Sequence, residues 1–220
     1  QTVAAAAPAV ERLRVFYNHP HFIEATSDRL TDALTRFPAE KRDKVYVVFT
    51  AHSIPVSAAK TSDYEMQLQE TCRLVAEATG VKHWKLAYQS RSGAPGQPWL
   101  EPDILDYLQT VSELGIRDVV ICPVGFISDH LEILFDLDVE AKDLAIDLGM
   151  TLVRAATVGT HPAFIRMVRE LICERIFPSE PKLAVGRYGP RPDVCAETCC
   201  PAPSRPVDAR RLANLVGQHR

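Results

Sequence analysis

The sequence lacks the long apolar run, the dense Lys/Arg block and the leader segment that would each place it in a special class. No apolar stretch approaches the ~18 residues that a membrane span requires, and the Ala-rich opening has no charged n-region of a signal peptide. With a formal net charge of -3 and no basic cluster, nothing favours nucleic acid as a partner. We therefore expect a cytoplasmic protein, and peripheral membrane contact through a loop is left open.

What is present is the composition of a packed globular chain. Hydrophobic residues make up 46% of its 220 positions, which suffices for one large or two small domains. We predict a linker over residues 1–13, a folded domain over residues 14–177 and a tail over residues 178–220. The tail contains seven prolines between Pro178 and Pro206, so it is not expected to add another layer of regular structure.

Apolar runs of strand length alternate with segments of helical periodicity. The predicted strands are residues 44–51, 84–89, 119–124 and 151–155; the predicted helices are 20–37, 62–79, 102–114 and 162–176, with a further acidic helix after residue 125. Gly80, Gly115 and Gly149 stand at helix ends, where a left-handed cap favours glycine. This alternation predicts an α/β fold around a four-stranded parallel sheet with right-handed crossovers.

Reactive side chains follow the ends of three predicted strands. His52 follows the first strand, Ser90 follows the second, and the turn at Gly125 leads from the third to Glu132. Because the carboxyl ends of parallel strands meet at one edge of a sheet, ligand sites form there. A neutral imidazole is both a base and a metal ligand near pH 7. The sequence therefore predicts a site around His52.

The acidic helix carries Glu132, Asp136 and Glu140 at i, i+4 and i+8, a spacing that stacks three carboxylates on one helix face. Like charges at that spacing repel each other, so a positive neighbour is expected. A hydrated divalent cation bound by oxygen ligands is one candidate. A solvated acidic face is the alternative.

Four motifs occur in order along the chain. They are residues 17–23 (YNHPHFI), 51–55 (AHSIP), 88–93 (YQSRSG) with 98–102 (PWLEP), and 123–132 (PVGFISDHLE). Together they resemble the ferrochelatases, enzymes that insert ferrous iron into a porphyrin. The resemblance implies a chelatase-like three-layer sandwich. It also implies that the chain is the second half of a longer enzyme, whose first helix here, residues 20–37, crosses from an N-terminal domain.

The resemblance implies roles for the groups around His52. His52 would take up pyrrole protons or contact the metal, and Glu132 would face it. Asp136 and Glu140 would extend a path for metal or protons outward. The structural alternative for His52 is a strand-end histidine that binds a backbone carbonyl. The substrates would be Fe2+ and either protoporphyrin IX or coproporphyrin III.

The porphyrin contacts implied by the resemblance are Ser90, Arg91, Trp99 and His130. An indole offers a flat apolar face, and a guanidinium can bind a propionate. The alternative for Trp99 is packing under its own loop. His130 could instead act through another residue or belong to the start of the acidic helix, with Asp129 as the cap.

Cys195, Cys199 and Cys200 lie within six residues of the tail. The tail resembles that of ferrochelatases with a 2Fe–2S cluster, which requires four thiolates. The first ligand of that family lies near Ala25, which is not cysteine here. The fourth ligand is left open between Cys173, a residue of the upstream half and none at all. Bound zinc and reduced thiols are the alternatives.

Two other functions are left open. A sirohydrochlorin-type chelatase that inserts cobalt or iron shares the fold, and a non-catalytic iron–sulfur or haem-binding module would use the tail alone. The Trp99 loop and residues 129–132 favour ferrochelatase, and the presence of both His52 and Glu132 argues against a non-catalytic module. The expected partners are the porphyrin and either the upstream half or a second subunit.

Overall fold

A parallel sheet of four strands forms the centre of the molecule. The structure is a computed structural model that describes residues 8, 10–93, 96–196 and 199. The strand order is β2-β1-β3-β4, and each neighbouring pair is parallel. The strands are β1 (Tyr46–His52), β2 (Trp84–Gln89), β3 (Asp118–Cys122) and β4 (Thr151–Arg154). The predicted α/β class and parallel sheet are confirmed, and the predicted strand bounds lie within two residues of those observed.

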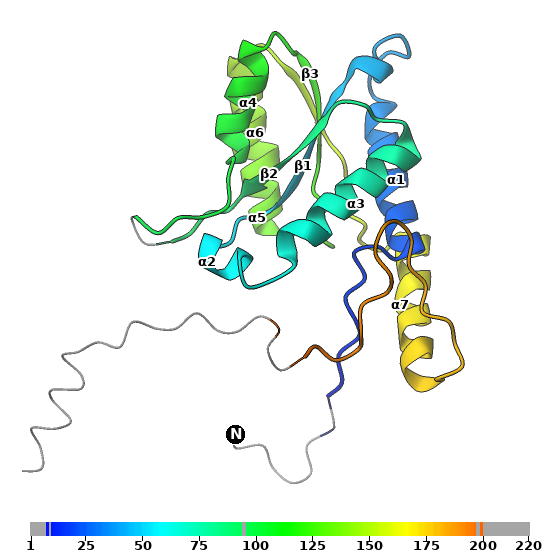
Figure 1. The fold of residues 1–220 in the computed structure, drawn as a ribbon. Coiled ribbons are helices and arrows are strands. Elements are labelled where there is room, and N and C mark those ends of the chain that lie inside the picture. Colours follow the sequence, from blue (N-terminus) through cyan, green and yellow to red (C-terminus); the bar gives the residue numbers. More distant parts are fainter. Residues whose placement is uncertain (1–7, 9, 94–95, 197–198, 200–220) are drawn as a thin grey trace, which may run out of the picture.

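Helices cover both faces of the sheet, which gives the predicted three layers (Figure 1). On one side lie α1 (Pro20–Leu34) and α3 (Tyr64–Thr79), and α7 (Pro162–Ile176) packs against α1; on the other side lie α4 (Ile104–Glu113) and α6 (Ala141–Asp147). Each side has its own buried apolar cluster. Two short elements were not predicted, α2 (Val56–Ala59) and the 3-10 helix η1 (Arg42–Lys44).

The alternation of side chains along β1 explains its continuous apolar sequence and the direction of His52. Phe49 and Ala51 belong to the cluster under α1 and α3, whereas Val48 belongs to the cluster under α4. A strand buried on both faces has no polar side, so the period-two pattern disappears. The same alternation places His52 on the side of Val48, which is the side of α4 and the acidic helix.

The predicted acidic helix is present, but it is not a regular α-helix. It begins as α5 (Leu131–Ile133), continues as the π-helix η2 (Leu134–Glu140) and ends as α6. A π-helix is bonded from i to i+5, so its turns are wider than those of an α-helix. The expected α-helical form is therefore wrong over residues 134–140, although all three carboxylates belong to this helix and Asp136 and Glu140 line one pocket. Short π-segments inside helices frequently occur at functional sites.

Both His-Pro pairs of the chain begin a helix in the same way. His19 Nδ1 accepts a hydrogen bond from the His21 N–H at 3.3 Å at the start of α1, and His161 Nδ1 accepts one from the Ala163 N–H at 3.3 Å at the start of α7. The proline that follows each histidine has no N–H to satisfy. The predicted left-handed glycines also occur, with φ of 71°, 80° and 64° at Gly80, Gly115 and Gly149.

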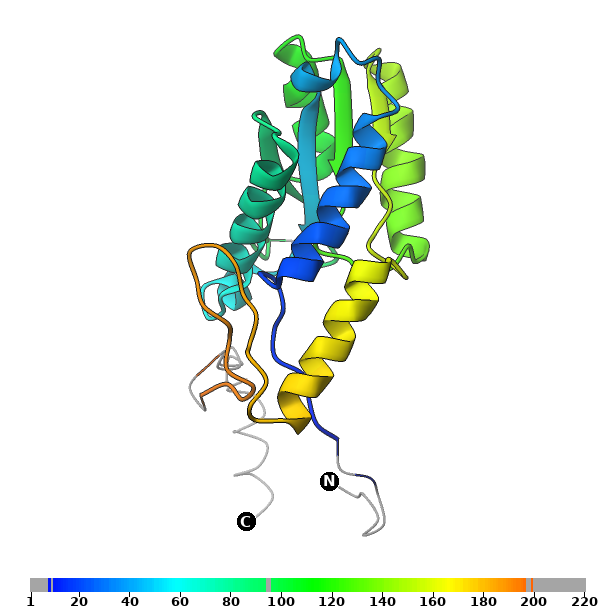
Figure 2. The same cartoon turned by 90° about the vertical axis from the view of Figure 1, so that its right-hand side faces the viewer.

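The described part of the tail adds no strand to the sheet, as predicted, yet it is fixed to the folded domain. Residues 183–189, the strap, pass beside the start of α1 (Figure 2). The fully buried Asn18 donates a hydrogen bond to the Tyr188 carbonyl at 2.8 Å, and the buried Glu70 accepts one from the Arg187 N–H at 2.8 Å. Such contacts between distant side chains and backbone leave no local sequence pattern, so the sequence did not predict the strap.

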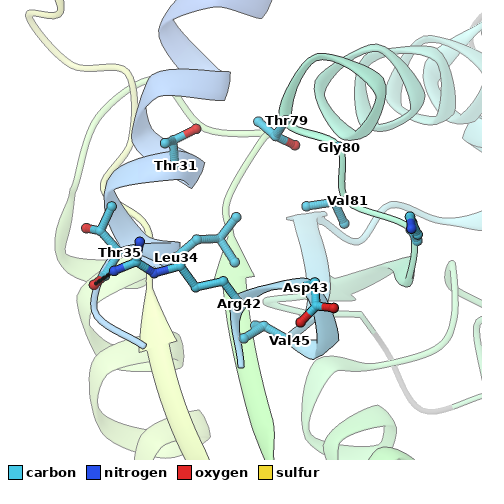
Figure 3. A pocket seen from close by; sticks show the side chains of 10 residues that line it. Thr31, Leu34, Thr35, Arg42, Asp43, Val45, Thr79, Gly80 and Val81 are labelled. Atoms are coloured by element: carbon cyan, nitrogen blue, oxygen red, sulfur yellow. Dashed lines mark hydrogen bonds between the residues drawn. The ribbon is translucent and has the colours of Figure 1, made fainter. Parts of the chain in front are cut away.

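A pocket of about 290 Å³ lies near the start of β1, at the end of the sheet opposite His52, between the last turns of α1 and α3 (Figure 3). Helix α1 ends at Leu34, three residues before its predicted end. Arg42 reaches across to donate hydrogen bonds to the carbonyl oxygens of Thr35 and Phe37. Its charge therefore completes this helix end, and the pocket contains none of the predicted site residues.

Among the described residues, no helix combines the length and the apolar character that crossing a membrane requires.

Candidate active site

Three strand ends bring the predicted site together. His52, the last residue of β1, lies in register with Gln89, the last residue of β2. After β3, the Gly125 N–H donates a hydrogen bond to the Thr50 carbonyl at 3.1 Å. A Cβ on Gly125 would lie 2.6 Å from the Cβ of Ala51, so only glycine lets the chain pass this close to β1. This close passage brings the acidic helix beside His52.

The imidazole of His52 faces the carboxylate of Glu132 across the site. His52 Nδ1 lies 2.5 Å from the Ser53 carbonyl oxygen, and because a carbonyl only accepts, Nδ1 carries the proton. Nε2 therefore presents its lone pair, and it lies 3.4 Å from a carboxylate oxygen of Glu132. The two side chains are 37% and 43% exposed, so both are accessible. Two acceptors at this distance are stabilised by a proton or a metal ion between them.

The backbone of His52 is held by buried neighbours. The Tyr64 hydroxyl donates to the His52 carbonyl at 2.9 Å, and burial raises the pKa of Tyr64 to about 12, so the donor stays protonated. The buried Ser53 donates its hydroxyl hydrogen to the Leu100 carbonyl at 2.9 Å. These bonds tie the end of β1 to α3 and to the loop that carries Trp99. The expected alternative of His52 as a carbonyl-binding residue is thus also seen, but it uses only one ring nitrogen.

Asp136 is fixed by two donors from the end of β2. Ser90 Oγ donates to Asp136 Oδ2 at 2.5 Å and Gln89 Nε2 donates to the same oxygen at 3.1 Å. Ser90 has a φ of 62°, a left-handed conformation that costs a non-glycine residue about 1–3 kcal/mol. Strain of this kind persists where the surrounding structure requires it. Here the hydrogen bond from Ser90 to Asp136 requires the left-handed conformation.

A polar pocket of about 230 Å³ opens beside Asp136. Ser90, Arg91, Asp103, Asp136 and Glu140 are among the residues that line it. Burial raises the pKa of Asp103 above its ordinary value, against the hydrogen bond that its carboxylate accepts from the Leu105 N–H. The pocket thus combines three carboxyl groups with a hydroxyl, which are the hard oxygen ligands that Mg2+, Mn2+ and similar cations prefer.

The positive neighbour expected for the acidic helix is Arg154, but it pairs with other carboxylates. Its guanidinium binds Asp138 through two hydrogen bonds of 2.7 and 2.9 Å and Asp129 through one of 2.8 Å. These bonds tie the start of the acidic helix and its π-helical turn to the end of β4. A cap at Asp129 was one of the alternatives left open by the sequence; His130 occupies the cap position.

The remaining predicted porphyrin contacts lie apart from one another. The edge of the Trp99 indole lies against Gly93, where a Cβ would come within 2.1 Å of Nε1. The indole therefore packs against its own loop, which was the structural alternative. His130 is exposed, and its ring stands edge-on to Phe126 at a centroid distance of 5.6 Å. The structure gathers His52, Glu132, Ser90 and Asp136, whereas Trp99 and His130 flank them.

An apolar pocket that sequence reasoning missed lies on the other side of Tyr64. It has a volume of about 160 Å³ and is lined by residues from three segments, including Phe16, Tyr17, Tyr64, Val124 and Ile127. Its residues come from distant parts of the sequence, so no local signal marked them. Because Tyr64 also binds the His52 carbonyl, the apolar pocket adjoins the site.

The ferrochelatase family model matches residues 1–176. The chain belongs to the ferrochelatase family. It is 47% identical over 201 residues to the ferrochelatase of Rhodopirellula baltica, covering 91% of this chain and 57% of that protein. It is 45% identical over 225 residues to the coproporphyrin III ferrochelatase of Nocardia farcinica, covering 95% of this chain and 63% of that protein. It is 43% identical over 210 residues to the coproporphyrin III ferrochelatase of Frankia alni, covering 91% of this chain and 54% of that protein.

The chain therefore spans little more than half the length of these ferrochelatases. Membership of the family confirms the resemblance drawn from the four motifs and favours a ferrochelatase over the sirohydrochlorin-type alternative. It gives the geometry around His52 and Glu132 a chemical context, since both motifs lie inside the matched region.

The cysteines of the tail are only partly described. Cys195 is exposed, and a hydrogen bond with Cys199 raises the pKa of the Cys195 thiol, so these two side chains lie together. Cys173 instead lines a pocket with Glu174, Glu180 and Pro181 beside α7. Cys200 lies outside the described residues.

One histidine–glutamate cluster joins α1 to α7. His21 Nδ1 lies 2.7 Å and His19 Nε2 3.6 Å from Glu170 Oε2. Among the described residues this is the one group of three potential metal-ligating side chains that converge. However, His19 Nδ1 accepts the capping hydrogen bond of α1, so its proton sits on Nε2, which is buried without a hydrogen-bond partner in the described part of the chain. Since a metal ion at Nε2 would displace that proton, the tautomer disfavours a metal site, and the hydrogen bond between His21 and Glu170 joins the two helices.

Proposed function

We propose that this chain forms the iron-handling half of an enzyme that inserts Fe2+ into a porphyrin for haem biosynthesis. The observation that carries the proposal is the 3.4 Å approach of His52 Nε2 and the Glu132 carboxylate, both acceptors and both accessible. Two ligand atoms about 2.1 Å from a tetrahedral metal ion lie about 3.4 Å apart. The same pair can hold a proton or a metal ion, the two species that an insertion reaction exchanges.

In the proposed reaction His52 is the base. Insertion replaces two pyrrole N–H protons with Fe2+, so both protons must leave the macrocycle. The Nε2 lone pair accepts a proton while Nδ1–H stays bound to the Ser53 carbonyl, and the imidazolium that forms is stabilised by Glu132. Asp136 and Glu140 supply carboxylates along the same helix for incoming Fe2+ or for outgoing protons.

We propose coproporphyrin III as the preferred porphyrin, because the relatives of Nocardia farcinica and Frankia alni are named coproporphyrin III ferrochelatases. Ser90 and Arg91, at the acidic pocket, and Trp99 and His130, beside it, are the proposed porphyrin contacts. Arg91 is exposed and its guanidinium fork suits a propionate carboxylate. Protoporphyrin IX remains the comparison substrate.

Anaerobic insertion of Fe2+ by the complete protein tests the proposal. His52→Ala is expected to lower kcat by about 100-fold or more, the usual contribution of a positioned base. Its thermal midpoint should stay within a few degrees of the parent, because the side chain is partly exposed. His83→Ala, an exposed histidine just before β2, is the matched control and should resemble the parent. Equal activity of His52→Ala and the parent would refute the role of His52. Comparing kcat/KM for the two porphyrins decides the substrate.

We also propose a 2Fe–2S cluster on the tail, with Cys195, Cys199 and Cys200 as ligands. The proximity of Cys195 and Cys199 supports it, but a cluster needs four thiolates. Ala25 is fully buried in α1, and Cys173 has different neighbours from Cys195. Visible absorption of anaerobically purified protein should vanish in Cys199→Ser. Loss of colour in Cys173→Ser would make Cys173 the fourth ligand, and a colourless parent without sulfide would refute the cluster.

The proposed partner is the upstream half of the same enzyme or a second subunit. Exposed apolar side chains along the acidic helix offer a surface for it: Leu131, Leu134, Phe135 and Val139. Peripheral membrane contact and a cytoplasmic location are proposals that cell fractionation tests. A protein recovered only in the membrane pellet would contradict the cytoplasmic location and support membrane contact.

A further inference from the structure

Gln89 lies next to His52, the proposed base, in the sheet and is hydrogen-bonded to the acidic helix. It ends β2 in register with His52, and period-two alternation places both side chains on the side of the acidic helix. From there its Nε2 donates to Asp136 Oδ2 at 3.1 Å. Among the described residues, both hydrogen bonds to the Asp136 carboxylate arrive at Oδ2. Oδ1 is thereby left available to a ligand in the pocket.

The amide of Gln89 is an unfavourable choice for the fold alone. The residue is 1% exposed, and its Oε1 is buried without a hydrogen-bond partner in the described part of the chain. A buried acceptor without a partner costs stability, whereas an apolar residue of the same size would not carry that cost. The amide is therefore explained by what it holds, which is Asp136.

We propose that Gln89 is a positioning residue that orients Asp136, so that Asp136 and Glu140 bind a hydrated divalent cation in the polar pocket beside His52. The inference rests on the proposed function and deepens it by naming the residue that sets the geometry of the metal path. Gln89 acts through Asp136: its amide is hydrogen-bonded to that carboxylate, and no hydrogen bond joins it to the His52 ring in the described part of the chain.

The hydrogen bond from Ser90 alone does not fix the Asp136 carboxylate, so the Gln89 amide is needed as well. Its hydroxyl binds the same oxygen but depends on a left-handed backbone at φ 62°. One donor allows a carboxylate to rotate about that contact, whereas two donors from consecutive residues of one strand end fix its plane. Removing the amide should therefore loosen Asp136 without removing it from the pocket.

Gln89→Met in the complete protein tests this role, because methionine matches the size of glutamine but cannot donate. The control is Gln109→Met, the same exchange at an exposed position of α4. Three quantities are compared with the parent: the thermal midpoint, the affinity for Mn2+ followed by electron paramagnetic resonance, and the Fe2+ dependence of insertion. Mn2+ is a suitable probe because it prefers carboxylate and water ligands.

The expected result for Gln89→Met is a midpoint no lower than that of the parent, about tenfold weaker Mn2+ binding, and a KM for Fe2+ raised by a similar factor. This is the loss expected for one hydrogen bond to a charged group, and kcat should stay within about twofold. Unchanged Mn2+ affinity and KM would overturn the inference, as would a lower midpoint with a parallel loss of kcat. A parent that inserts no iron would refute the proposed function instead, and the Mn2+ comparison would still decide the role of Gln89.

Discussion

Replacing Arg14 by methionine is expected to destabilise the folded chain by about 3–5 kcal/mol, the cost of leaving one partner of a buried ion pair alone. Arg14 donates to both carboxylate oxygens of Glu174, at 2.7 and 2.9 Å, and the two side chains are 1% and 3% exposed. Arg14 also donates to the Leu183 carbonyl at 2.8 Å, which fixes the start of the strap. Methionine would fill the space but satisfy none of these three acceptor atoms.

The pH dependence of the free energy of unfolding of Arg14→Met gives a second, independent test. Burial alone would raise the pKa of Glu174, but the hydrogen bonds and charge of Arg14 outweigh burial and hold it below its ordinary value. A carboxyl group with a lowered folded pKa stabilises the fold above its unfolded pKa of about 4.3, and that stability is lost as the pH falls through the folded pKa. In Arg14→Met burial is opposed mainly by the weaker hydrogen bond from the Leu183 N–H, so the pKa of Glu174 rises and the deficit relative to the parent should shrink from pH 7 to pH 5.

Urea denaturation at pH 7 and pH 5 measures both effects, and the double variant Arg14→Met/Glu174→Met is the control. Replacing both charges by apolar groups of similar size should recover most of the loss, because no uncompensated charge remains in the core. A loss below about 1 kcal/mol in Arg14→Met would refute the reasoning, since that is the range of exposed pairs. So would a double variant that is as unstable as the single one.

Two further predictions concern the surroundings of the site. Tyr64→Phe removes the donor to the His52 carbonyl and should lower stability by about 1 kcal/mol, or about 2–4 °C in thermal midpoint, measured by calorimetry; an unchanged midpoint would contradict that bond. Gly93→Ala must displace the indole of Trp99, because the new methyl would lie 2.1 Å from Nε1, so the tryptophan fluorescence should change. Gly189→Ala meets no atom within 4 Å and is the control; equal spectra for both variants would contradict the packing of Trp99.

The fold was largely predictable because its signals are local. The continuous apolar run in β1 follows from burial on both faces, and the glycines at residues 80, 115 and 149 mark helix ends by their left-handed conformation. The π-helical turn of η2 was not predictable, since its wider hydrogen bonding has no distinct hydrophobic period. The strap depends on Asn18 and Glu70, buried side chains far from it in sequence, and a local pattern cannot show such contacts.

The site was predictable as a set of strand ends, but not as a set of contacts. The meeting of His52 with Glu132 follows from the parallel topology, which gathers the ends of β1 and β3. No local pattern singles out Gln89, because it ends a strand and its partner Asp136 lies far along the chain. The packing of Trp99 depends on Gly93, a loop residue whose partner only the folded chain reveals.

The charge around His52 differs between its two sides, the acidic helix and the apolar pocket. Arg154 neutralises Asp129 and Asp138, whereas Asp136 and Glu140 have no Lys or Arg within ion-pair distance in the described part of the chain. Arg91 lines the same pocket, but the carboxylates of Asp136 and Glu140 outnumber it and raise the local concentration of cations on the side of the acidic helix. The apolar pocket lies on the other side of Tyr64 and offers no such charge. Under the proposed function, Fe2+ would approach from the acidic side, while the apolar side suits a flat macrocycle. His52 lies between the two, where a base that removes the pyrrole protons must stand.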